Sequence, residues 1–295
     1  MSSSGVILVT GATGNVGGAV ISSLTASGAN VRALVRDASK AQSLKSAGVD
    51  VVEGDLEKPE TLDAAFRGVD KVFLLTPVSP DAAAQSSNAI AAAKRSGRPH
   101  IVRMSAVKAS HDSPTRIGRL HAETEDELKA SGLPYTILKP HFFMQNTMMA
   151  AQTVASEGVV YMPFKEARLG MVDVRDIGEV AAKVLTEDGH EGQTYTLTGP
   201  ATISLHDVAA GLSKALGREV SYVDVPLEAS RQAMLGMGMP EWTVGGYGEY
   251  FEAYSEGYGD FTTDDVARVT GKSARSYESF ARDFASAFGK RSLAA

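Results

Sequence analysis

Short apolar runs alternate with amphipathic stretches along the first half of the chain. The apolar runs are rich in β-branched residues and predict strands at 6–10, 30–36, 49–53, 71–76, 100–105 and 135–139. The stretches between them predict helices near 15–27, 38–47, 59–67, 80–96 and 117–131. Glycines stand just beyond the expected helix ends, as at Gly28 and Gly132, where left-handed backbone is common. This alternation predicts an α/β fold with a doubly wound parallel sheet and helices on both faces.

The pattern becomes less regular after Pro140. A helix rich in Phe and Met is expected over 141–157. Short strands are expected at 159–162, 170–174, 194–197 and 220–225, and helices at 176–185, 204–217 and from 227 onward, with a Gly/Tyr-rich patch over 245–259. We expect Asp176 to cap the helix that ends at Leu185. The chain therefore divides into a domain over 1–140 and a smaller α/β lobe over 141–295. Whether strand 171–174 and helix 176–185 return to the first domain stays open.

Composition narrows the possible partners. The 295 residues are 43% hydrophobic and 22% charged, as in ordinary soluble globular proteins. The net charge of -6 offers no basic surface for nucleic acid, and no run reaches the roughly 18 apolar residues of a membrane span. The absence of cysteine excludes disulfides and cysteine-ligated metal, and His206 has no second ligand at metal spacing. We expect a cytoplasmic monomer or homodimer with no nucleic-acid, membrane or metal partner.

A glycine-rich turn joins the first expected strand to the first expected helix. It reads Thr10-Gly11-Ala12-Thr13-Gly14-Asn15-Val16-Gly17-Gly18, with glycines spaced G-x-x-G-x-x-G. Such a turn needs backbone room, and the helix start offers free N–H groups to a pyrophosphate. Because strand and helix stand on the correct sides, the motif predicts the dinucleotide site of a Rossmann-type sheet. Its expected contacts are Gly11, Ala12, Thr13, Gly14, Asn15, Val16 and Gly17.

Six segments together resemble the NmrA-like branch of the extended short-chain dehydrogenase/reductases. They read TGATGNVG, ALVRD, VEGDLEKPETLDAAFRGVD, SGLPYTILKPHFFMQN, MVDVRDIGEVAAKVL and TYTLTGP, and the likeness runs from about Gly5 to Val225. This branch includes quinone, azo dye and triphenylmethane dye reductases, and also redox-sensing regulators that bind the cofactor without turnover. The resemblance implies a nicotinamide cofactor, but its motifs do not specify a substrate.

The end of the second expected strand favours NADPH over NADH. Arg36 stands at this end with Lys40 close behind, and a guanidinium suits the 2′-phosphate of NADP. The alternative is a surface arginine paired with Asp37, an acid that would tolerate NADH. The remaining expected cofactor contacts are Asp55, Leu56, Thr76, Pro77, His121 and Pro140. The resemblance implies the adenine-side role of Asp55, for which a simple turn aspartate is the alternative.

The usual proton donor of short-chain reductases is missing. Those enzymes use Tyr-x-x-x-Lys with an upstream serine, and the lysine lowers the pKa of the tyrosine. In the matching stretch, Ile117 stands in place of the tyrosine and His121 in place of the lysine, while Ser105 is retained. We expect His121 and Ser105 to be the catalytic residues. His121 either donates a proton, since its ordinary pKa is near neutrality, hydrogen-bonds the cofactor, or is structural.

The missing acid constrains the substrate. Reduction of a simple ketone creates a localised alkoxide, which needs an immediate acid or oxyanion stabiliser. A quinone, an azo bond or a triarylmethyl cation spreads or cancels the incoming charge, so that positioning against the nicotinamide carries most of the rate. We therefore expect a small conjugated aromatic substrate.

Aromatic and Met residues after the sixth strand, with others from a later Met/Gly/Tyr-rich segment, predict the substrate site. The candidates are Phe142, Phe143, Asn146, Met148, Trp242 and Tyr247. Met and aromatic residues at helical spacing are equally typical of a core, and the later segment is equally typical of a dimer contact. Two functions remain: an NADPH-dependent reductase of aromatic acceptors, or a catalytically silent NADP(H) sensor that binds a protein partner.

Overall fold

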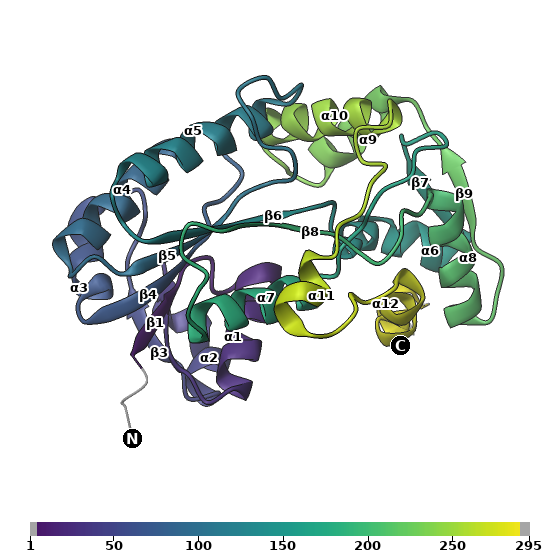
Figure 1. The fold of residues 1–295 in the computed structure, drawn as a ribbon. Coiled ribbons are helices and arrows are strands. Elements are labelled where there is room, and N and C mark those ends of the chain that lie inside the picture. The colour runs from purple at the N-terminus through teal and green to yellow at the C-terminus, as the bar shows by residue number, and fades with distance from the viewer. Residues whose placement is uncertain (1–4, 290–295) are drawn as a thin grey trace.

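The computed structural model describes residues 5–289 and is built around a seven-stranded parallel sheet (Figure 1). The strands lie in the order β3-β2-β1-β4-β5-β6-β8. Their bounds are β1 (Val6–Val9), β2 (Asn30–Val35), β3 (Asp50–Glu53), β4 (Val69–Leu74), β5 (His100–Met104), β6 (Tyr135–Pro140) and β8 (Thr194–Leu197). The order reverses between β1 and β4, which is the switch point where ligands bind in such sheets. The predicted Rossmann-type fold is confirmed.

Helices cover both faces of the sheet (Figure 1). One face carries α1 (Asn15–Ala26), α2 (Gln42–Ser46), α7 (Val174–Thr186) and α11 (Asp265–Thr270). The other carries α3 (Leu62–Phe66), α4 (Ala82–Arg95) and α5 (Arg116–Ala130). Short 3-10 turns η1 (Ala38–Ala41) and η2 (Pro59–Thr61) precede α2 and α3. Each face has its own apolar core, because the strands are buried on both sides.

Helices α1 and α7 lie in direct contact beneath the switch point. Val20 and Ile21 of α1 are buried in one cluster with Ile177 of α7. A Cβ at Gly178 would lie 2.7 Å from the backbone of Ala19, so the two helix backbones approach closely. This packing fixes the direction in which α1 leaves the glycine turn.

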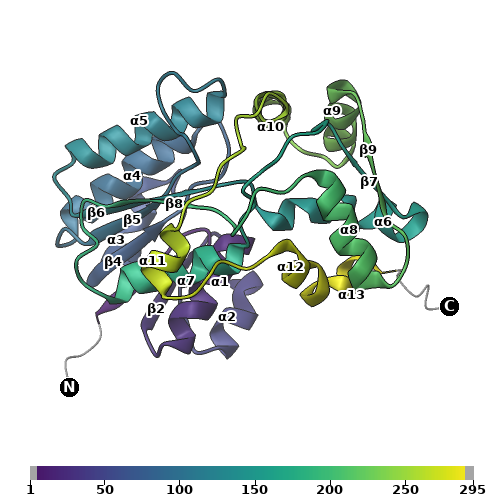
Figure 2. The same cartoon turned by 45° about the vertical axis from the view of Figure 1, so that its right-hand side comes forward.

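A second lobe packs around its own core beside the carboxyl ends of the strands (Figure 2). It contains a two-stranded parallel sheet of β7 (Val159–Met162) and β9 (Ser221–Asp224). Its helical elements are η3 (Met144–Ala150), α6 (Ala151–Glu157), α8 (Leu205–Leu216), α9 (Leu227–Gly236), α10 (Glu241–Ser255), α12 (Tyr277–Asp283) and α13 (Ala285–Phe288). The predicted boundary at residue 140 stays a prediction. In the structure α7, β8 and α11 come after it in sequence and lie on the large sheet.

The strand predicted over 170–174 is wrong. Only isolated bridges form here, between Val172 and Phe143 and between Leu169 and Ile203. Asp173 caps α7 by accepting the N–H of Arg175 at 2.9 Å, so the helix begins before the predicted cap at Asp176. The Asp176 carboxylate instead accepts the backbone N–H of Arg275 at 2.8 Å.

Two further elements differ from the prediction in their regularity. The single helix predicted over 141–157 is a 3-10 segment to Ala150 followed by α6. The Gly/Tyr-rich patch is a regular helix to Ser255, in which Gly245 and Gly246 face α5. A Cβ at Gly246 would lie 2.7 Å from the side chain of Ile117, so the missing side chain lets α10 approach α5.

The C-terminal part of the chain returns from α10 along β8 to α11 (Figure 2). The backbone N–H of Thr196 in β8 donates to Asp265 at 2.7 Å, and that of Thr263 donates to the Thr198 hydroxyl at 2.9 Å. Arg275 then binds the α7 residue Glu179 at 2.5 Å. These contacts secure the outer edge of the sheet.

Candidate functional site

The glycine turn forms a tight cradle at the switch point. Gly11 has a φ of +63°, and a Cβ there would lie 2.5 Å from the side chain of Leu75. A Cβ at Gly17 would lie 2.1 Å from the Gly11 carbonyl oxygen, so α1 begins directly against the turn. Gly14 is the N-cap of α1, and no side chain caps it. The first N–H groups of the helix are therefore available to a phosphate.

Thr10 joins β1 to β4 at the base of this cradle. Its hydroxyl donates to the carbonyl oxygen of Leu75 and accepts that residue's N–H, both at 2.8 Å. The side chain is buried. Both strand ends are thus held together where the turn begins.

The end of β2 presents an unpaired cation. Arg36 is exposed, and its guanidinium has no partner within residues 5–289. Asp37 instead caps the short turn η1, accepting the Ser39 N–H at 2.9 Å and the Ser39 hydroxyl at 2.5 Å. These hydrogen bonds lower the pKa of Asp37. Lys40 lies 3.7 Å from the same carboxylate and is mostly exposed. The alternative pairing of Arg36 with Asp37 does not form.

The other expected cofactor residues lie at neighbouring strand ends. Asp55 accepts the N–H of Glu57 at 3.1 Å, which is the hydrogen bond expected of a simple turn aspartate. Its second carboxylate oxygen has no protein partner among the described residues. The Leu56 carbonyl oxygen accepts from Asn88 at 2.8 Å. Thr76, before Pro77, is buried and accepts from Arg103 at 3.3 Å. Pro140 is buried at the end of β6.

Ser105 follows β5 and is part of a buried charged cluster. Its hydroxyl donates to Glu125 of α5 at 2.5 Å. The other Glu125 oxygen lies 3.0 Å from the Lys139 ammonium and 3.4 Å from that of Lys129. The Glu125 side chain is 3% exposed and that of Lys129 is 41% exposed, so the cluster extends from solvent to the strand end.

His121 lies on α5 beside a fully buried arginine. Arg103 is 1% exposed and donates to Thr124 at 3.0 Å, while its Nε and Nη1 atoms have no protein partner within the described chain. Burial, with the positive charges of Arg103 and Lys139, lowers the pKa of His121 to about 3. The ring is half-buried, and its enclosed Nδ1 has no partner among the described residues. His121 is therefore neutral near pH 7 and carries no proton to give as an imidazolium.

Ile117 is covered by α10. Its side chain is buried against Gly246, and the neighbouring Arg116 binds Glu249 of α10 at 2.7 Å. Thr243 of α10 also donates to the Val78 carbonyl oxygen, in the loop after β4, at 3.1 Å. Helix α10 thus contacts both the start of α5 and the loop after β4, and its backbone covers Ile117 at the position of the missing tyrosine.

The predicted substrate residues divide into buried and half-exposed groups. Phe142 is buried edge-on against Phe164, with ring centroids 5.5 Å apart, so it belongs to the core alternative. Half-buried side chains that border the second core are Met148, Trp242 and Tyr247. Phe143 is half-buried against the sheet core, and Asn146 is half-buried without a side-chain partner in the described part of the chain. These five remain available to a ligand.

His141, directly after β6, is a structural histidine that the sequence did not single out. Its Nδ1 accepts the N–H of Phe142 at 2.7 Å, and its Nε2 donates to the Gly259 carbonyl oxygen at 3.0 Å. Burial lowers its pKa to about 4. It ties the returning C-terminal segment to the end of β6.

We expect this burial to make the protein acid-sensitive. The unfolded chain protonates His141 near pH 6.5, whereas the folded state resists protonation until about pH 4. The contribution of His141 to the free energy of unfolding is complete above pH 6.5 and falls as the pH drops. At pH 5 it is smaller by about 2 kcal/mol. The free energy of unfolding, measured in urea between pH 7 and 5, should decline less in His141→Gln than in wild type. His111→Gln is the control, because His111 is exposed and bonded to Asp126. An equal decline in all three proteins would contradict the assignment.

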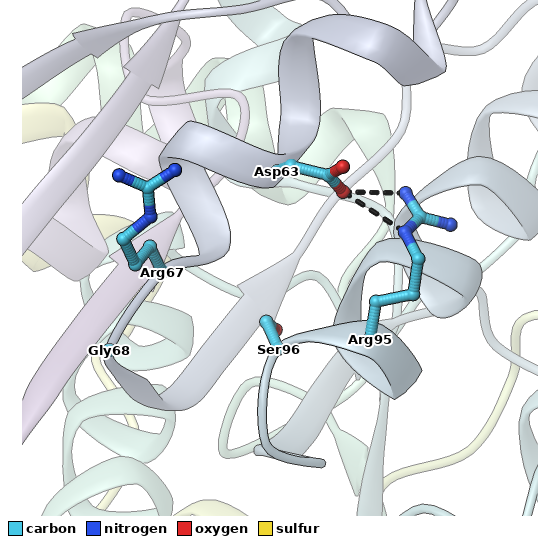
Figure 3. Close-up of a pocket in the computed structure, with 5 residues that line it drawn as sticks. All are labelled: Asp63, Arg67, Gly68, Arg95 and Ser96. Atoms are coloured by element: carbon cyan, nitrogen blue, oxygen red, sulfur yellow. Dashed lines mark hydrogen bonds and ion pairs between the residues drawn. The ribbon is translucent and has the colours of Figure 1, made fainter.

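A surface hollow of about 280 Å³ lies away from this site. Asp63 and Arg95 form an ion pair there at 2.7 Å. Figure 3 shows this pair, with the Arg67 side chain pointing away from it. The hollow borders the residues that lead into β4 and β5, so it lies at the amino ends of the strands. It is on the opposite edge of the sheet from the glycine turn.

Three charged residues of the site were missed from the sequence. Arg103 and Lys139 lie inside runs predicted as buried strands, where a charge is itself unusual. Glu125 lies four residues after His121 and so shares its helix face.

No helix in the described chain is long and apolar enough to cross a membrane. Within residues 5–289, no group of three or more His, Asp or Glu side chains is placed to hold a metal.

Comparison with known proteins places these features among reductases. The profile of the NmrA-like family matches residues 3–281. An NAD(P)H azoreductase from Xenophilus azovorans is 44% identical over 284 residues, covering 96% of this chain and 99% of the relative. Triphenylmethane reductase from Citrobacter sp., crystallised with NADP(H), superposes with a TM-score of 0.83 at 29% identity, over 95% of this chain and 99% of its own. NADPH-dependent quinone oxidoreductase from Escherichia coli, crystallised with NADPH, gives 0.84 at 28% identity, over 94% and 99%.

Proposed function

This chain belongs to the NmrA-like family, and we propose that it is an NAD(P)H-dependent reductase that transfers hydride to a conjugated aromatic acceptor. The three relatives are named for azo, triphenylmethane and quinone reduction. One observation in this chain carries the proposal: at the carboxyl edge of the sheet, where the glycine cradle also lies, Ile117 is buried and His121 is neutral. That pair has no proton ready for a localised alkoxide, which disfavours a simple ketone.

The residues present fit NADPH. The cradle leaves no room for a Cβ at Gly17 and presents uncapped N–H groups at the start of α1. Arg36 is free to bind a 2′-phosphate, with Lys40 nearby, while Asp37 is engaged by Ser39. When bound, NADPH supplies the hydride. Asp55, Leu56, Thr76, Pro77 and Pro140 complete the proposed contacts along the strand ends.

The protein's own contribution to hydride transfer is mainly positioning. The half-buried Phe143, Met148, Trp242 and Tyr247 offer apolar surface for a flat ring, and Asn146 offers an amide. Neutral His121 orients a ligand through hydrogen bonding, and Ser105 fixes a polar group at the end of β5. An acceptor that spreads the incoming negative charge takes its proton from water after the transfer.

We expect NADPH oxidation with aromatic acceptors and not with aliphatic ketones. The assay follows the NADPH absorbance band with a naphthoquinone, an azo dye and a triphenylmethane dye, beside cyclohexanone as the control. At least one aromatic acceptor should be reduced at a rate roughly 100-fold or more above cyclohexanone, since the ketone requires the missing acid. Efficient ketone reduction, with aromatic acceptors inert, would contradict the proposal.

The alternative function is a catalytically silent NADP(H) sensor, and Ile117 in place of the tyrosine favours it. Tight NADPH binding without oxidation by any of the three acceptors would support the sensor.

We also propose a cytoplasmic monomer or homodimer without a nucleic-acid partner, since the net charge is -6. Gel filtration and a binding assay with duplex DNA test these points.

A further inference from the structure

The hydroxyl of Ser105 is fixed in one direction. A serine hydroxyl has one hydrogen to donate and two lone pairs to accept with, and when free it rotates to suit its partner. Here the hydrogen is donated to Glu125 at 2.5 Å. The backbone N–H of Ser105 donates to the carbonyl oxygen of Leu138 at 2.8 Å, so it is not available to a ligand.

The surroundings of Glu125 prevent the hydroxyl from turning away. Lys139 and Lys129 both approach the oxygen of Glu125 that Ser105 does not use, at 3.0 and 3.4 Å. Each oxygen of Glu125 therefore faces a donor, and a carboxylate held in ion pairs only accepts hydrogen bonds. Withdrawing the Ser105 hydrogen would leave the Glu125 oxygen that Ser105 binds buried with one donor fewer.

We propose that Glu125 makes Ser105 an obligate hydrogen-bond acceptor, so that this position recognises a ligand group that donates an N–H or O–H. Ser105 immediately follows β5 at the carboxyl edge of the sheet, beside the end of β4, where Thr76 stands. A carbonyl or oxyanion meets only lone pairs at this atom and is disfavoured. Glu125 is a positioning residue, because it acts through Ser105.

Two ligands could supply the donor, and this part of the inference rests on the proposed function. One is the carboxamide N–H of the nicotinamide, and the other is a hydroxyl or amino group on the aromatic acceptor. The shared chemistry is a neutral donor that approaches the Ser105 Oγ. The two sources are separated by probes that lack the donor on one side only.

The cofactor test compares the binding of NADP⁺ with that of its 3-acetylpyridine analogue, in which a methyl ketone replaces the carboxamide. The acceptor test compares the reduction of 4-hydroxyazobenzene with that of 4-methoxyazobenzene by NADPH. Wild type should prefer the donor-bearing probe by roughly tenfold in one of the two tests, the value of one hydrogen bond. In the acceptor test the difference should appear in KM.

The variants are Ser105→Ala and Glu125→Gln, with exposed Ser110→Ala and Glu123→Gln as matched controls. Ser105→Ala should reduce the preference to within about twofold. Glu125→Gln should reduce or invert it, because an amide can donate to Ser105 and free its hydrogen. Both controls should keep it. If Glu125→Gln does not fold, Ser105→Ala still decides the role of Ser105.

A lack of preference in both tests, or a preference that survives in Ser105→Ala, would overturn the proposal. So would a folded Glu125→Gln that behaves like Glu123→Gln. The cofactor test is an equilibrium measurement and needs no turnover. Failure of the proposed reductase function would instead appear as no NADPH oxidation by wild type with any acceptor.

Discussion

Replacing Gly17 with alanine is expected to weaken NADPH binding by about 100-fold or more, equivalent to about 2.7 kcal/mol. The new Cβ would lie 2.1 Å from the carbonyl oxygen of Gly11 and 3.0 Å from the Cα of Ala12. Both are backbone atoms, so no side chain can turn aside to make room. The start of α1 must move away from the turn, and the N–H groups that face the phosphates move with it.

Gly18 provides a matched control for this substitution. It is the next residue in the same helix, and a Cβ there meets nothing within 4 Å. Gly18→Ala should leave NADPH affinity within about twofold and stabilise the helix by up to about 1 kcal/mol. Isothermal titration with NADPH and urea unfolding on both variants give the comparison. Equal binding by Gly17→Ala and Gly18→Ala would show that the phosphates do not use this turn.

Removing the Arg36 side chain should change cofactor preference. Arg36→Ala is expected to weaken NADPH binding roughly 30-fold, or about 2 kcal/mol, and to alter NADH binding less than about twofold. The reason is that the guanidinium at the end of β2, which has no partner within residues 5–289, is proposed to bind the 2′-phosphate, which NADH lacks. Dissociation constants for both cofactors, measured at one ionic strength, test the expectation.

Two companion variants separate charge from geometry at this strand end. Arg36→Lys should retain part of the NADPH affinity, because an ammonium keeps the charge without the planar pair of donors. Lys40→Ala should have a smaller effect than Arg36→Ala, since the mostly exposed Lys40 already lies near Asp37. A parallel loss of NADPH and NADH affinity in Arg36→Ala would remove the basis for NADPH preference.

The sheet was predictable because the strands of the first 140 residues, apart from the edge strand β3, carry runs of buried apolar residues. The run of β1 is continuously apolar, and β4 ends in the apolar run Val72–Leu74. The elements around 170 were not predictable in this way. Met171 and Val172 are fully buried by tertiary contacts, yet the backbone forms only single bridges there, and apolar sequence alone does not distinguish the two. The need for a glycine at position 246 likewise arises from Ile117, which is distant in the sequence.

The site was predictable where local backbone defines it. The glycine turn and the end of β2 are set by residues adjacent in sequence. The charged cluster is different, because Ser105, Glu125 and Lys139 come from a strand end, a helix and another strand. The sequence left three roles open for His121. Burial beside Arg103 lowers the pKa of His121 to about 3, which disfavours the proton-donor role, and this shift could not be inferred before the packing was known.

The contacts of residues 263–265 with β8 also matter during synthesis. The sheet's outermost strand is held by Thr263 and Asp265, which are made long after β6. At roughly 5–20 residues per second, a ribosome needs about 6–25 s to travel from residue 140 to residue 265. During that interval the residues that cover the sheet edge have not yet been synthesised. The exposed edge of the nascent chain can then pair with other chains being made on the same mRNA.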